Sequence, residues 1–298
     1  MSHDGPDLHV TTYGPADAAV AVVLAHCWTA DEADWHYQVR DLLARFGHQV
    51  RIVTWDHRGH GRSPALAAAH CTIDNLASDM GAVIDHHAPH GRLVVAGHSI
   101  GGMTMTALPT IRPDLIGRIS GLAFVASSSG GLDTVTLGFP EVAGRLVRPQ
   151  VPRLLAIRAR TMSRRARRGS PRIERWVAQR FFFGPGARSR DVGLCVDQLI
   201  NCSADTFSGY YNDMMRHQRT GALSAFDGIP TTVLVGSRDL LTPPAHSRRI
   251  AAGIHGARFL VAPEAGHYLP LERARLVSDE LIALTETALR SQPATALR

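Results

Sequence analysis

Val94-Val95-Ala96-Gly97-His98-Ser99-Ile100-Gly101-Gly102 has the pattern of a buried strand, a G-x-S-x-G turn and the first residues of a helix. At such a junction the central serine is held in a strained backbone conformation, and the flanking glycines leave it room. The serine hydroxyl then stands at a sheet edge and at a helix N-terminus, where the helix dipole favours negative charge. We therefore predict that Ser99 is a nucleophile. A tight turn in a nucleotide-binding fold is the alternative that this pattern leaves open.

Short aliphatic runs alternate with helical patterns on both sides of this junction. Runs of this length rich in Val, Ile and Leu are typical of buried strands, and their alternation with helices predicts a mostly parallel, doubly wound α/β sheet. The predicted strands are Ala19–Leu24, Val50–Trp55, Arg92–Ala96, Gly121–Ala126, Thr231–Val235 and Arg258–Val261. The predicted helices are Trp35–Phe46, Thr72–His86, Ile100–Thr110, about Ala245–Ile254 and about Leu271–Leu289.

This alternation is interrupted between Leu132 and Gly221, where strand-like runs are lacking. The region contains the helix-like segments Pro152–Arg168 and Pro171–Phe183. A helical insertion between two strands commonly covers the carboxyl edge of the sheet, where α/β folds bind ligands. We predict a core made of residues 1–131 and 222–298, and a helical lid made of residues 132–221.

A serine hydroxyl is a weak nucleophile unless a histidine takes its proton and a carboxylate orients that histidine. Asp239 and His267 each follow a predicted strand of the C-terminal part, so both should lie at the sheet edge that carries Ser99. We predict a catalytic triad of these three residues. Asp133 and Asp227 are rival candidates for the acid, although position along the chain favours Asp239.

With these motifs the chain resembles the α/β-hydrolase family, in particular its lidded serine-hydrolase branch of esterases, lipases and non-haem haloperoxidase-like proteins. The resemblance covers nearly the whole chain and implies an α/β-hydrolase fold with the lid inserted after the sixth strand. It implies that residues 97–101 form the nucleophile elbow, and that the backbone N–H groups of Trp28 and Ile100 form the oxyanion hole. Residues 56–63 are similar to a structural turn of the family, so their histidines are not expected to bind a metal.

The substrate pocket is expected to include His26, Cys27, His98 and Met103. Cys27 stands where the family usually has glycine, and its side chain should narrow the cleft. A small buried thiol is the favoured interpretation. A redox-sensitive or alternative nucleophile would need a histidine partner of its own, which the sequence does not indicate.

The residue types restrict the chemistry. A serine in the elbow argues against the epoxide-hydrolase and dehalogenase branches, which use a carboxylate there, and the 32 basic residues include no lysine for Schiff-base chemistry. We predict cleavage of a carboxylic ester, lactone or thioester of a small molecule through an acyl-enzyme on Ser99, without cofactor or metal. The alternatives are cofactor-free perhydrolase or haloperoxidase-like chemistry, hydrolysis of carbon–carbon bonds, and a non-catalytic binding role.

Positive charge is concentrated between Arg145 and Arg190, where 14 arginines accompany one acidic residue, Glu174. We interpret this basic stretch as a solvated helical face or as a docking surface for an acyl-carrier protein, a coenzyme A ester or an anionic membrane. No nucleic-acid partner is expected, because the stretch has few aromatic residues and no recognised motif. Four cysteines without CxxC spacing, no signal peptide and no run of membrane-spanning length predict a cytoplasmic protein with reduced thiols.

Overall fold

A seven-stranded sheet forms the centre of the computed structural model, which describes residues 7–147 and 149–291. The strand order is β1-β3-β2-β4-β5-β6-β7, with β1 antiparallel to β3 and every other neighbouring pair parallel. The strands are β1 (Val10–Tyr13), β2 (Val20–Ala25), β3 (Arg51–Trp55), β4 (Arg92–His98), β5 (Ile119–Val125), β6 (Thr231–Gly236) and β7 (Arg258–Ala262). The predicted mostly parallel sheet is confirmed.

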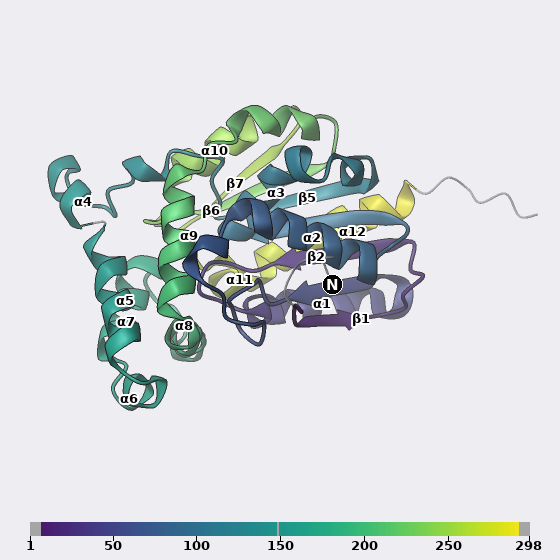
Figure 1. Cartoon of the computed structure of the whole chain (residues 1–298). Helices are drawn as coiled ribbons and strands as arrows, with labels where there is room; N and C mark the ends of the chain where they lie inside the picture. Colours follow the sequence, from purple (N-terminus) through teal and green to yellow (C-terminus); the bar gives the residue numbers. More distant parts are fainter. Residues whose placement is uncertain (1–6, 148, 292–298) are drawn as a thin grey trace, which may run out of the picture.

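Helices cover both faces of this sheet, as Figure 1 shows. Successive strand residues point to opposite faces, so Val22 packs into one core and Val23 into the other. One face is covered by α1 (His36–Phe46) and α12 (Ala274–Arg290), and the other by α2 (Ile73–His87), α3 (Ile100–Ile111) and α10 (Pro244–Ala252). The doubly wound arrangement predicted from the alternation is therefore confirmed.

Strand β1 has no counterpart among the predicted strands. It is only four residues long, lies at the sheet edge and has every residue half-buried, so it lacks the continuous apolar run of a buried parallel strand. The C-terminal helix also differs from its prediction, because a short helix, α11 (Leu269–Glu272), precedes α12. These departures leave the central strands unchanged.

Residues 132–221 lie between β5 and β6, and their described part contains helices and no strand. The insertion therefore follows the fifth strand of the described sheet and not the sixth, as the resemblance implied, because this sheet has seven strands. The helices are α4 (Glu141–Val147), α5 (Gln150–Thr161), α6 (Arg164–Gly169), α7 (Arg172–Val177), α8 (Ser189–Asn201) and α9 (Ala204–Arg216), with a π-helical turn at Ala178–Phe182. In Figure 1 they gather on the left of the sheet. We call residues 132–221 the helical insertion. The single helix expected over Pro152–Arg168 is two, because Met162 is extended and Ser163 caps α6.

The basic stretch is not a uniformly exposed face. Arg167 is buried and donates a hydrogen bond from its guanidinium to the carbonyl oxygen of Ile200 over 2.6 Å, whereas Arg164, Arg165 and Arg168 are exposed. Other arginines of the stretch form ion pairs with Glu174, Asp191 and Asp205. Carboxylates of α8 and α9 thus offset part of the charge. Among the described helices, none combines the length and apolar character needed to cross a bilayer.

Candidate active site

Ser99 occupies a strained turn between β4 and α3. Its backbone has φ 55° and ψ −113°, a conformation that costs a residue with a side chain about 1–3 kcal/mol. A Cβ atom on Gly97 would lie 2.3 Å from the carbonyl carbon of Gly101, and one on Gly101 would lie 2.3 Å from the carbonyl oxygen of Ala25. The turn therefore requires both glycines, and it places Ser99 directly before the N-terminus of α3.

Asp239 and His267 follow β6 and β7 and are brought together at the carboxyl end of the parallel strands, the end at which Ser99 follows β4. His267 Nδ1 lies 2.9 Å from Asp239 Oδ2, and both side chains are almost completely buried. The second carboxylate oxygen, Oδ1, accepts hydrogen bonds from the backbone N–H groups of Leu241 and Thr242, each over 2.9 Å. The carboxylate is therefore fixed in orientation. It accepts the Nδ1 proton of His267, so that Nε2 has a free lone pair.

The rival acids lie elsewhere. Asp133 and Asp227 are both exposed, and Asp227 accepts a hydrogen bond from the backbone of His255 over 2.6 Å. Within the described residues, Asp239 is the carboxylate that pairs with His267. The geometry therefore favours Asp239 as the acid.

The loop that carries His267 is attached to the helical insertion. The backbone N–H groups of His267 and Tyr268 both donate to the carbonyl oxygen of Phe182, over 2.8 and 3.2 Å. The carboxylate of Glu272 accepts from the backbone N–H groups of Gly184 and Gly266, over 2.8 and 3.0 Å. One carbonyl group and one carboxylate thus hold the π-helical turn and the His267 loop together.

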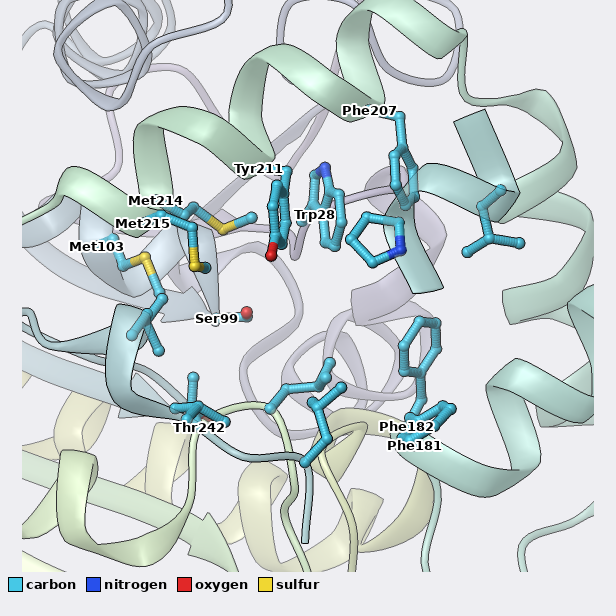
Figure 2. Close-up of a pocket in the computed structure, with 16 residues that line it drawn as sticks. Trp28, Ser99, Met103, Phe181, Phe182, Phe207, Tyr211, Met214, Met215 and Thr242 are labelled. Atoms are coloured by element: carbon cyan, nitrogen blue, oxygen red, sulfur yellow. The ribbon is translucent and has the colours of Figure 1, made fainter. Parts of the chain in front are cut away.

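A cavity opens above Ser99, between the sheet edge and the insertion (Figure 2). The cavity has a volume of about 90 Å³. Among the residues that the structure describes, no charged side chain lines it. Lining residues are Trp28, Ser99, Met103, Leu132, Val135, Leu137, Pro152, Leu155, Phe181, Phe182, Phe207, Tyr211, Met214, Met215, Leu241 and Thr242.

Helix α9 forms one wall of this cavity. Phe207, Tyr211, Met214 and Met215 are spaced by four, three and one residues, so they share one helix face. Figure 2 shows the hydroxyl of Tyr211 directed toward Ser99. These four residues were not predicted from the sequence, although their spacing is the signal that identifies an apolar helix face.

Of the four residues expected in the pocket, Met103 lines the cavity and the other three do not. His26 and His98 are completely buried, and their rings form hydrogen bonds with residues of neighbouring loops. Cys27 is 2% exposed, and its thiol donates to the carbonyl oxygen of Trp28. The expectation that Cys27 narrows the cleft is therefore wrong. Trp28, one residue further along, presents its ring to the cavity instead.

Three histidines in the loops that follow β2 and β3 pack together: His26, His57 and His60. His26 and His57 have ring centroids 4.0 Å apart. Backbone N–H groups of His57 and Thr29 donate to Nε2 of His26 and of His60, over 2.8 and 3.2 Å, so those lone pairs are occupied. Burial lowers the pKa of His57 to about 3 and that of His60 to about 4. The histidines of this cluster are therefore neutral near pH 7, and their role is structural.

The family model described as "Alpha/beta hydrolase family" matches residues 22–280. Over 284 residues the chain is 29% identical to "Putative carbamate hydrolase RutD" of Variovorax paradoxus (strain S110), covering 92% of this chain and 94% of that protein. It is 36% identical to "Bifunctional esterase/perhydrolase DCH" of Acinetobacter calcoaceticus over 99 residues, about a third of each chain. The solved enol-lactonase of Burkholderia xenovorans LB400 superposes with a TM-score of 0.75 at 23% identity, covering 96% of this chain and 99% of that one. That likeness shows a shared fold.

Proposed function

The chain belongs to the alpha/beta hydrolase family and is a hydrolase, and we propose that it cleaves carboxylic esters or related acyl bonds through an acyl-enzyme on Ser99. The observation that carries the proposal is the hydrogen bond between His267 and Asp239, at the sheet edge where Ser99 stands in its strained turn. An oriented histidine supplies the base that a serine nucleophile needs.

In the proposed reaction, Nε2 of His267 takes the proton from Ser99 Oγ as the oxygen attacks the acyl carbon. Asp239 keeps the imidazole in the required tautomer and stabilises the imidazolium that forms. The imidazolium then protonates the leaving group, and the acyl group stays on Ser99. Water, deprotonated by the same histidine, hydrolyses this acyl-enzyme and restores the serine hydroxyl.

The backbone N–H groups of Trp28 and Ile100 are the proposed oxyanion donors. Ile100 is the first residue of α3, and the first amides of a helix have no partner within the helix. Trp28 borders the cavity at the end of the β2 loop. Donors fixed at these positions would stabilise the negative charge that develops on the acyl oxygen.

The helical insertion is proposed to act as a lid that selects the substrate. It provides Leu155, Phe181 and the α9 wall of the cavity, while the core provides Ser99 and Met103. Because no charged side chain lines the cavity within residues 7–147 and 149–291 as far as they are described, an ionised acyl group would lose its hydration without a compensating partner there. We therefore propose an uncharged, apolar acyl group as the substrate class.

A panel of p-nitrophenyl substrates tests this function. We expect kcat/KM to rise from acetate to butyrate, and the hemisuccinate, whose acyl group is of similar size but negatively charged, to be at least about 10-fold poorer than butyrate. A p-nitrophenyl carbamate belongs in the panel because of the similarity to a protein named as a carbamate hydrolase. Ser99→Ala should lower kcat by about 10³-fold or more. Undiminished turnover by Ser99→Ala would refute the proposal.

A further inference from the structure

A buried pair of residues, Asp34 and His98, lies behind the proposed triad. His98 Nδ1 and Asp34 Oδ2 are 2.7 Å apart, and neither side chain is exposed to solvent. Asp34 belongs to a 3-10 turn, Glu32–Trp35, that follows β2, and His98 is the last residue of β4, directly before Ser99. Neither residue lines the cavity. The pair therefore contacts no substrate, and any effect on catalysis must act through neighbouring residues.

The hydrogen bonds of this pair reach each of the three loops that the proposed mechanism uses. His98 Nε2 donates to the carbonyl oxygen of His267 over 3.0 Å. Asp34 Oδ2 accepts the backbone N–H of Cys27 over 3.2 Å, and Cys27 is adjacent to the proposed oxyanion donor Trp28. His98 itself is bonded to Ser99 through the chain. One buried hydrogen-bond network thus fixes the nucleophile, base and oxyanion loops relative to one another.

The protons in this network can be counted. A carbonyl oxygen only accepts, so His98 Nε2 must carry a hydrogen. One further proton then lies between His98 Nδ1 and Asp34 Oδ2, and the pair has no net charge whichever atom holds it. Removal of one partner leaves a buried group without its hydrogen bond, which is more costly than replacing both.

A metal ion is a poorer occupant of the same cluster. One ligand atom from each of Cys27, Asp34 and His98 lies within 4.8 Å of the others. Both ring nitrogens of His98 are already engaged by oxygen atoms, and the Cys27 thiol donates to a backbone carbonyl. Asp34 Oδ1 is buried and has no hydrogen-bond partner among the described residues, but one free carboxylate oxygen does not make a metal site.

We propose that Asp34 and His98 are positioning residues, which hold the His267 loop and the Trp28 loop in register with Ser99. This inference rests on the proposed function. A displacement of about 1 Å in a catalytic group can cost about 10²-fold in rate, so loosening this network should lower kcat more than it raises KM.

The test compares four single variants by kcat and KM for p-nitrophenyl butyrate, the rate of fluorophosphonate labelling and the melting temperature. Asp34→Asn and His98→Leu should lower kcat and the labelling rate about 10- to 100-fold, with KM changed less than about 3-fold. His98→Gln should recover part of the loss, because its amide N–H can donate to the carbonyl oxygen of His267. Asp79→Asn is the matched control, since Asp79 is also buried, in an ion pair with Arg58.

Asp79→Asn should lose stability but keep kcat within about 2-fold of wild type, because its ion pair lies outside the three loops. The double variant with Asp34→Asn and His98→Leu should have a kcat close to that of the less active single variant, since the two residues act as one unit. Wild-type kcat in folded Asp34→Asn would overturn the inference, as would equal activities of His98→Gln and His98→Leu. If Ser99→Ala is inert in the same assays, such results refute the positioning role and leave the proposed function standing.

Discussion

The backbone N–H of His267 donates a hydrogen bond over 2.8 Å to the carbonyl oxygen of Phe182. Phe182 lies in the π-helical turn of the insertion and lines the cavity, so the loop of the proposed base and one wall of the cavity are joined directly. A change that separates them should disturb both the chemistry and substrate binding.

Gly184→Ala tests this connection. A Cβ atom on Gly184 would lie 2.1 Å from the carbonyl oxygen of Glu264, so the insertion must move away from the His267 loop. We expect kcat to fall about 10-fold or more, with an increase in KM, in steady-state assays on p-nitrophenyl butyrate. Gly193→Ala is the control, because a Cβ atom added to Gly193 in α8 would meet nothing within 4 Å beyond the backbone of its own helix. Unchanged kinetics of Gly184→Ala would show that the connection has no catalytic effect.

Asp239→Asn should lower kcat by about 10⁴-fold with little change in KM, because the amide stabilises the wrong imidazole tautomer. Asp133→Asn and Asp227→Asn are matched substitutions of the two exposed rivals, and each should retain nearly full activity. The same ester assay measures all three. Nearly full activity of Asp239→Asn would assign the acid to another residue.

The four cysteines should be inert in the folded protein. All are buried, and burial raises the pKa of Cys71 to about 11 and those of Cys195 and Cys202 to about 12, which disfavours the reactive thiolate. The pKa of Cys27 is also raised by burial. Iodoacetamide at pH 8 should therefore leave activity intact and alkylate the cysteines only after unfolding. Rapid inhibition with alkylation of Cys27 in the native protein would contradict this result.

Acidification should destabilise the fold before it protonates most carboxylates. Burial lowers the pKa of His57 to about 3, and those of His60 and His217 to about 4, whereas the unfolded chain binds these protons near pH 6.5. Their contribution to stability is complete above pH 6.5 and is lost as pH falls toward these values, by up to about 1.4 kcal/mol per pH unit for each histidine.

Urea unfolding at pH 7.5, 6.5 and 5.5 measures this effect. The free energy of unfolding should decrease at each step, and His217→Gln should show a shallower decrease than wild type because one buried histidine is removed. His255→Gln, at an exposed position, should keep the wild-type slope. Equal stability at pH 7.5 and 5.5 would contradict the account of these buried histidines.

The sheet could be predicted from sequence because buried parallel strands are continuous aliphatic runs, a purely local signal. The central strands have boundaries within two residues of the predicted ones. β1 could not be predicted in this way, since it is short, half-buried and pairs at the edge. A triad of Ser99, Asp239 and His267 could be proposed because each residue follows a predicted strand. The distance of 2.9 Å between His267 Nδ1 and Asp239 Oδ2 is known only from the folded chain.

The residues that line the pocket were harder to predict from the sequence, because they depend on the direction of each side chain. Trp28 lines the cavity, whereas its neighbour Cys27 is buried and does not, in a loop where Thr29 has a positive φ of 66°. Nothing in the local pattern distinguishes these two neighbours. The partnership of His98 with Asp34 likewise joins residues 64 positions apart, which a single sequence does not reveal.

The central claim is that Ser99 carries the acyl group, and the most direct measurement is mass spectrometry of the protein after reaction with a fluorophosphonate. Because Arg112 precedes a proline, trypsin should release Ser99 in the peptide of residues 93–118, well separated from the peptide that contains Cys27. We predict one adduct per chain, with fragment ions that place it on Ser99, and none in Ser99→Ala. An adduct on another residue, or none in a wild-type protein that hydrolyses esters, would contradict the account.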